Sequence, residues 1–138
     1  MADTKQDVLD MLRELVELTL LDEADPQSFR VRAYENAAQA IGSQANDLGR
    51  LSLADLKKIH GIGSSTAQKI RELIETGRVE KLDRLRAEYP PGLVALLRLQ
   101  GIGPKAVRRL HSELGVQSLD DLRVIMGYVA GTLGPPPS

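Results

Sequence analysis

Apolar residues recur with a helical period through most of the chain. In residues 4–21 their spacing places them along one side of a helix, with acidic residues on the other side. These apolar positions are Val8, Leu9, Leu12, Leu15, Val16 and Leu18. Asp3 or Thr4 would cap this helix, and the polar cluster Asp22–Ser28 ends it, with Pro26 suited to the start of the next helix.

The segment that follows fits two patterns. Phe29–Tyr34 alternates like a strand, but the run continues to Ile41, and its apolar positions then fall on one helical face. That face consists of Tyr34, Ala37, Ala38 and Ile41. The longer pattern predicts a helix over residues 29–41.

The rest of the chain predicts more helices and no strand. The helices are expected at 53–59, 65–76, 80–88 and 92–99, then from behind the second Gly-Ile-Gly to 114, and after the cap Ser118. Ser52 would cap the helix at 53–59. Gly77 and Gly115 would end the helices that precede them, and residues 42–49 would form a loop. The predicted fold is all-α, with a four-to-five-helix bundle at 1–89, a smaller helical unit at 90–128 and a flexible tail at 129–138.

One stretch occurs twice, at residues 56–71 and 96–111. The two copies align at a shift of 40 residues, and each has an apolar lead-in, the sequence Gly-Ile-Gly and a basic helical pattern. The aligned pairs are Gly61 with Gly101, Gly63 with Gly103, and Lys69 with Arg109. A single Gly-x-Gly could be no more than a tight turn or a helix cap, whereas two matched copies are unexpected by chance.

Gly-Ile-Gly between two helices predicts a hairpin whose second helix begins with exposed amides. Glycine accepts a positive φ and a close backbone approach, while the isoleucine would fill the helix crossing. The first amides of the second helix lack partners within it and lie at the positive end of its dipole, so they favour an anion. The pattern is typical of the helix-hairpin-helix motif, which grips a nucleic-acid phosphate without reading bases. The expected DNA-binding residues are Gly61, Gly63, Ser65, Gly101, Gly103, Lys105, Ala106 and Arg109.

The charge distribution is compatible with nucleic-acid binding, although the net charge is −1. Residues 1–28 carry eight acids and two bases, and residues 29–138 carry sixteen bases and eleven acids. The second part can therefore present a weakly basic face. Cysteine is absent, which excludes disulfides, and no apolar run approaches a membrane span. We expect a cytoplasmic protein, nucleoid-associated in a bacterium, with no membrane partner and no required cofactor.

Four blocks of the sequence resemble the N-terminal portion of family X DNA polymerases. They begin at Phe29, Ile59, Thr76 and Leu99, and together the resemblance covers residues 8–126. It implies a small lyase domain followed by a DNA-gripping subdomain that bind gapped or nicked DNA. The family's palm, with its metal-binding carboxylates, has no counterpart here, so this chain alone would not polymerise nucleotides. The sequence is compatible with a complete chain or with a piece of a longer polymerase.

The resemblance also implies roles for individual residues. Lys69 matches the lysine that attacks an abasic sugar, and the residues matching the family's 5′-phosphate site are Arg30, Tyr34, Lys57 and Lys81. Backbone carbonyls before the hairpins would hold a monovalent cation, Na⁺ or K⁺. These carbonyls are those of Lys57, Ile59, Ile62, Leu97, Leu99 and Ile102. Two positions depart from the family, with Ser65 in place of a phosphate-binding lysine and Phe29 in place of a histidine, and both weaken the phosphate site.

A lysine that forms a Schiff base must be partly neutral, which requires burial or nearby cations. Lys69 lies at the edge of the apolar face of its predicted helix. The nearby cations would be Arg30, Lys57 and Lys81. Glu72 argues against this role, since an ion pair would keep Lys69 protonated. The alternative is an ordinary surface lysine. His60 and His111 lie at no metal-binding spacing.

Three functions remain open from the sequence. The first is a repair module that removes a 5′-deoxyribose phosphate through Lys69. The second is a non-catalytic module that binds DNA ends or tethers a repair protein such as a polymerase, ligase or nuclease. The third is an interaction module that does not bind nucleic acid.

Overall fold

The computed structural model describes residues 4–45, 47–99 and 102–125, and every regular element among them is a helix. The all-α prediction is therefore confirmed. The elements are α1 (Thr4–Glu23), α2 (Phe29–Gly42), the 3-10 helix η1 (Leu48–Arg50), α3 (Leu53–Lys58), α4 (Ser64–Thr76), α5 (Glu80–Glu88), α6 (Pro91–Leu97) and α7 (Pro104–Leu114). Residues 119–125 are also helical. The predictions for Asp3, Gly101 and the tail 129–138 concern positions outside the described residues.

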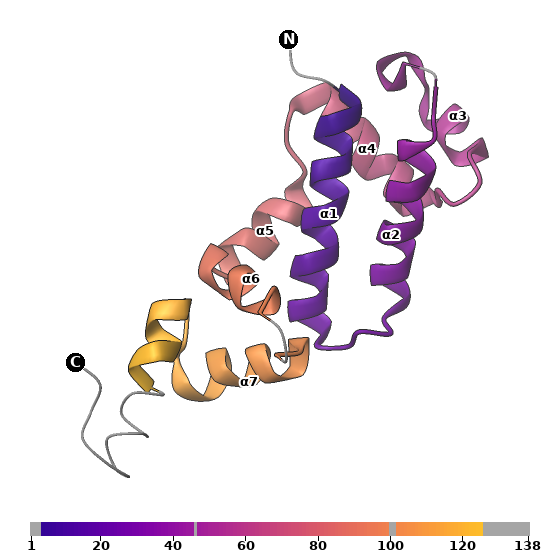
Figure 1. Ribbon diagram of the computed structural model, residues 1–138. Coiled ribbons are helices and arrows are strands. Elements are labelled where there is room, and N and C mark those ends of the chain that lie inside the picture. Colours follow the sequence, from indigo (N-terminus) through magenta and orange to yellow (C-terminus); the bar gives the residue numbers. More distant parts are fainter. Residues whose placement is uncertain (1–3, 46, 100–101, 126–138) are drawn as a thin grey trace.

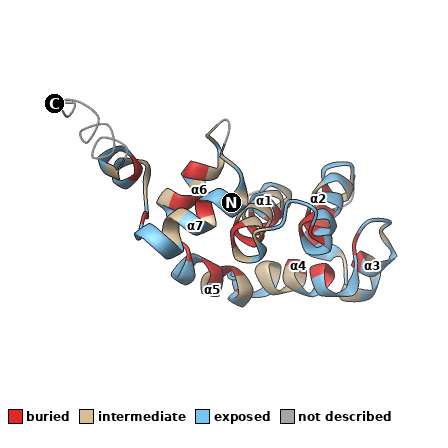
Figure 2. Ribbon diagram, turned by 90° about the horizontal axis from the view of Figure 1, so that it is seen from below, coloured by how far each residue is buried: buried red, intermediate tan, exposed pale blue. Residues whose placement is uncertain are grey.

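Helix α1 is the centre of the fold. Figure 1 shows α2 on one side of it, α5 and α6 on the other, and α7 across its end. The buried residues of α1 are Val8, Met11, Leu12, Leu15, Leu18, Thr19 and Leu21. Buried positions of the surrounding helices face inward around α1 (Figure 2). The same core continues through Val107, Val116 and Leu122, so the second hairpin packs on α1 together with the first. The domain boundary at 89/90 falls between α5 and α6 and stays a prediction.

A serine cap makes residues 29–41 a helix rather than a strand. The Ser28 hydroxyl accepts hydrogen bonds from the amides of Arg30 and Val31, so the helix begins at Phe29. The expectation that Pro26 starts this helix is wrong, because Pro26 lies in the turn before the cap. Phe29 is 87% exposed while Val31 and Tyr34 are buried, which is the outcome of a helical rather than an alternating pattern.

Most other boundaries agree with the sequence to within a residue or two. Ser52 forms a reciprocal cap with Asp55, and Gly77 and Gly115 end their helices at positive φ. The loop predicted at 42–49 is shorter, because α2 includes Gly42 and η1 begins at Leu48.

Two arginines from later helices fasten the fold to α1. Arg86 of α5 and Arg98 at the end of α6 each form a two-pronged ion pair, with Glu14 and Glu17 respectively. The bond between Arg86 and Glu14 joins residues 72 positions apart in the sequence. The acidic side of α1 thus has partners within the protein, and its charge is partly neutralised by the helices that pack on it.

Candidate nucleic-acid interface and amine site

The first hairpin joins α3 to α4 through a turn that needs glycine at one position. Gly61 has a φ of 98°, and a Cβ there would lie 3.3 Å from the carbonyl oxygen of Asn36 on α2. Ile62 is 5% exposed and fills the crossing as predicted. Gly63 differs from the expectation, because its φ is −84° and no atom lies within 4 Å of an added Cβ. Its lack of a side chain leaves open space in front of α4.

The first backbone amides of α4 lack hydrogen-bond acceptors among the described residues. Gly63 is the N-cap residue and no side chain caps the helix. Ala67 is the first residue of this turn whose amide has a backbone acceptor, the carbonyl oxygen of Gly63 at 2.9 Å. Within the described residues, the amides of Ser64, Ser65 and Thr66 have no hydrogen-bond partner. Their geometry is that of an anion site at a helix start.

The second hairpin has the same form at the residues that the structure describes. Gly103 is the extended N-cap residue of α7, Pro104 occupies the first helical position, and no side chain caps the helix. The amides of Lys105 and Ala106 therefore face outward without a partner in the described part of the chain. Arg109 is exposed and lies 3.4 Å from Glu113.

Two of the carbonyls expected to hold a monovalent cation already accept turn hydrogen bonds. Ile59 accepts from Ile62 at 3.1 Å, and Leu99 accepts from Ile102 at 3.4 Å. A carbonyl oxygen has a second lone pair, so both remain able to bind an ion. The cation sites stay a prediction.

Lys69, the expected nucleophile, and three of the four residues expected to hold a 5′-phosphate line one pocket of about 450 Å³. Arg30 and Tyr34 come from α2, Lys69 from α4 and Lys81 from α5. Ser65 and Thr66 complete its polar wall, and no carboxylate lines it. Lys57 is exposed on α3 and does not line this pocket. The pocket, which we call the amine pocket, therefore presents three cations and a phenol to its contents.

The Lys69 amine is held at the edge of this pocket. Its Nζ donates a hydrogen bond to the Ser65 hydroxyl at 2.8 Å and lies 5.9 Å from the centre of the Tyr34 ring. Burial lowers the pKa of Lys69, and the positive charges of Lys81 and Arg30 lower this pKa further. A larger share of the neutral, nucleophilic amine is therefore present at neutral pH than for a solvated lysine.

Glu72 does not hold Lys69 in an ion pair. Its carboxylate accepts a hydrogen bond from the amide of Glu80 at 2.7 Å, at the start of α5. The charge of Glu72 raises the pKa of Lys69, but burial and the two cations outweigh it. The sequence argument against Lys69 is thus overturned by a contact between two helices.

Tyr34 supplies a protonated hydroxyl to the amine pocket. The residue is 5% exposed, and burial raises its pKa, an effect that the charge of Arg30 opposes. A hydroxyl that keeps its proton can donate to a phosphate oxygen.

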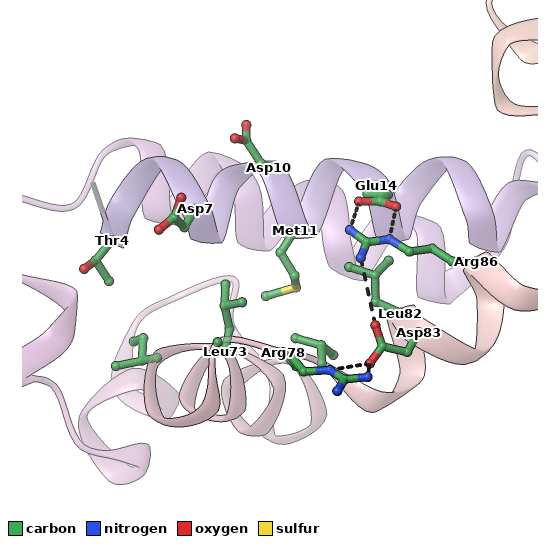
Figure 3. Close-up of a pocket in the computed structure, with 13 residues that line it drawn as sticks. Thr4, Asp7, Asp10, Met11, Glu14, Leu73, Arg78, Leu82, Asp83 and Arg86 are labelled. Carbon is green, nitrogen blue, oxygen red and sulfur yellow. Dashed lines mark hydrogen bonds and ion pairs between the residues drawn. The ribbon is translucent and has the colours of Figure 1, made fainter. Parts of the chain in front are cut away.

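The groove between α1 and the α4–α5 connection has a different charge. Figure 3 shows Arg86 paired with Glu14 and Arg78 paired with Asp83, beside the carboxylates of Asp7 and Asp10. Its cations are thus neutralised and its remaining charge is negative, which disfavours a phosphate.

Comparisons with known proteins agree with this geometry. A family model described as "Helix-hairpin-helix domain" matches residues 3–79, and one described as "SAM-like Helix-hairpin-helix tandem" matches residues 93–124. The first match covers more than half of the chain. The chain belongs to the helix-hairpin-helix domain family.

This helix-hairpin-helix protein is also similar to several DNA polymerases. It is 34% identical over 119 residues to the DNA polymerase/3′-5′ exonuclease PolX of Bacillus subtilis (strain 168), which covers 86% of this chain and 20% of that protein. It is 28% identical over 102 residues to DNA polymerase lambda of Rattus norvegicus, covering 74% of this chain and 17% of the polymerase. The resemblance to the N-terminal region of family X polymerases is confirmed. The chain spans about a fifth of the length of these relatives.

Other candidate residues of the helix-hairpin-helix protein have structural roles. Arg108 follows the second hairpin in the sequence, but its guanidinium donates to the carbonyls of Leu21 and Asp22 at the end of α1. His111 bonds the carbonyl of Val116 through Nδ1, at 3.0 Å. No group of three metal-ligating side chains occurs in the described residues, and no helix among them is long and apolar enough to cross a membrane.

The charge of Lys81 gives the helix-hairpin-helix protein a testable pH dependence. Lys81 lowers the pKa of Lys69, so Lys81→Gln should raise it. The rate of any reaction that needs the neutral amine would then require a higher pH. We expect the pH profile of borohydride trapping on an abasic 5′ end to move to higher pH in Lys81→Gln. An unchanged profile would show that the two amines do not interact.

Proposed function

We propose that this chain binds gapped or nicked DNA through its sugar–phosphate backbone and removes a 5′-deoxyribose phosphate with Lys69, as a module of base excision repair. The observation that carries the proposal is the amine pocket, in which a lysine with a lowered pKa lies among Arg30, Tyr34 and Lys81. The similarity to DNA polymerases named PolX and lambda supports the choice of DNA as the ligand. The hairpins are suited to contacts with phosphates on either side of the lesion.

The chemistry requires only the amine and a weak base. The neutral Lys69 amine adds to C1′ of the ring-opened sugar, and water leaves as the Schiff base forms. The protonated imine then makes the C2′ proton acidic, and water can accept this proton. The electron pair of the C2′–H bond becomes the new double bond as the C3′–O bond breaks, and the phosphate leaves with the C3′ oxygen.

Borohydride trapping on a one-nucleotide gap tests the activity directly. Wild-type protein should form a covalent adduct with a gap whose 5′ end carries deoxyribose phosphate. It should form none with the same gap carrying an intact 5′-phosphorylated nucleotide, which has no aldehyde. Absence of an adduct on the abasic gap, with binding to both gaps retained, would leave the non-catalytic DNA-end binder as the function. Absence of binding at low salt would leave the protein-interaction module.

Lys105 tests the contribution of the second hairpin to DNA binding. Its side chain is exposed beside two outward-facing amides. If it neutralises one phosphate, Lys105→Ala should weaken binding to gapped DNA and lower the slope of log affinity against log salt by about 1. The matched control is Arg13→Ala, which removes an exposed cation from α1. Equal slopes for wild type and Lys105→Ala would exclude the contact.

A further inference from the structure

A second pocket lies against the amine pocket, and Lys69 stands between the two. This pocket of about 350 Å³ shares Ser65, Lys69 and Lys81 with the amine pocket. Its other lining residues come from the outer side of α4 and from α5, whereas those of the amine pocket include α2. The amine pocket therefore extends from Lys69 to α2, and the second pocket extends from the same amine along α4 and α5.

An arginine without a partner lines the second pocket. Arg84 is exposed on α5, and within the described residues its guanidinium makes no ion pair or hydrogen bond, although Glu80 and Glu88 lie one helical turn away on either side. The other arginine of α5, Arg86, is bound by Glu14. Arg84 is therefore available to a ligand that lies beside Lys69.

The charges of the two pockets differ in a way that fits two kinds of phosphate. Arg30, Lys69 and Lys81 line the amine pocket without any carboxylate. The second pocket has Lys69, Lys81 and Arg84 but also Glu72 and Glu80. A terminal phosphate monoester carries close to two negative charges at neutral pH, whereas a phosphodiester carries one. The more positive pocket thus suits the terminal phosphate, and the mixed pocket suits the diester.

We propose that the second pocket binds the phosphodiester on the 3′ side of the abasic sugar and that Arg84 holds this leaving phosphate. The inference rests on the proposed lyase function and adds the site of the leaving group. The 5′-phosphate lies in the amine pocket, C1′ lies at Lys69, and the 3′ phosphate lies at Arg84. When the C3′–O bond breaks, the electron pair stays on the phosphate oxygen, and the diester becomes a monoester with one more negative charge. The guanidinium donates hydrogen bonds to this phosphate as its charge increases.

Arg84→Ala separates this site from the chemistry at Lys69. We measure the single-turnover release of the downstream strand from an abasic gap, and the borohydride trapping of free 2-deoxyribose 5-phosphate, which has no 3′ phosphate. Arg84→Ala should slow strand release about tenfold, the effect of losing one charged hydrogen bond, and leave trapping of the free sugar phosphate unchanged. Arg84→Lys keeps the charge and should recover part of the rate. Arg13→Ala is the control for loss of an exposed cation.

Each outcome decides the inference. Strand release at the wild-type rate in Arg84→Ala would overturn it. Equal losses with both substrates would also overturn it, because Arg84 would then act on Lys69 or on the fold rather than on the 3′ phosphate. If wild-type protein traps neither substrate, the proposed lyase function fails and this inference fails with it. If wild-type protein is trapped and Arg84→Ala releases the strand at the wild-type rate, the lyase function stands. Only the assignment of the 3′ phosphate to the second pocket is then refuted.

Discussion

Replacing Lys69 with arginine is expected to abolish the borohydride adduct while leaving DNA binding within about threefold of wild type. Arginine keeps the positive charge and the reach needed to contact a phosphate or the Ser65 hydroxyl. Its guanidinium stays protonated under all assay conditions, so it cannot form the imine. The measurement is adduct yield on an abasic gap at saturating protein, with affinity for the same DNA measured in parallel.

Lys58→Arg is the matched control for this substitution. Lys58 is exposed at the end of α3 and lines neither pocket beside Lys69. The Lys58→Arg protein should therefore give the same adduct yield as wild type. A Lys69→Arg protein that still cross-links at the wild-type level would assign the chemistry to another amine and refute the role of Lys69.

Gly92→Ala is expected to destabilise the fold strongly, because backbone atoms occupy the space that its side chain would need. A Cβ at Gly92 would lie 2.2 Å from the carbonyl oxygen of Gln117 and 2.8 Å from the Cα of Ser118. Neither atom can move by a change of rotamer, so relief requires α6 to move away from the segment that follows α7. We expect a loss of about 3 kcal/mol in the free energy of unfolding and a fall of roughly 10 °C in Tm.

Gly42→Ala is the control for the loss of a glycine. Gly42 ends α2, and no atom lies within 4 Å of an added Cβ. Alanine should therefore maintain stability or raise it by about 0.5 kcal/mol. If Gly92→Ala unfolds like wild type in thermal melts, the packing of α6 against residues 117 and 118 is wrong.

The local features of the fold could be predicted from the sequence because they depend on neighbouring residues. The helical period of residues 4–21, the caps at Ser52 and Ser118, and the C-terminal glycines Gly77 and Gly115 are each written within a few positions. The two hairpins were recognisable because the pattern repeats. The gathering of Arg30, Tyr34, Lys69 and Lys81 was implied only by resemblance to a family, since nothing local brings α2, α4 and α5 together.

The features that could not be predicted depend on contacts between distant helices. In the sequence, Arg108 is a basic residue next to a hairpin. In the structure, carbonyls at the end of α1 accept its hydrogen bonds. Glu72 is one turn from Lys69, but the first amide of α5 engages its carboxylate. Arg84 could not be distinguished from Arg86 by pattern, because only the position of Glu14 on α1 decides which arginine is paired.

Mapping the trapped sugar to a single residue tests the central claim most directly. After borohydride reduction on an abasic gap and digestion of the DNA and protein, mass spectrometry should find the sugar adduct on the peptide containing Lys69, at that residue. An adduct on Lys57 or Lys81 in place of Lys69, or one spread over the surface lysines, would contradict the proposal that one partly buried amine beside the first hairpin performs the reaction.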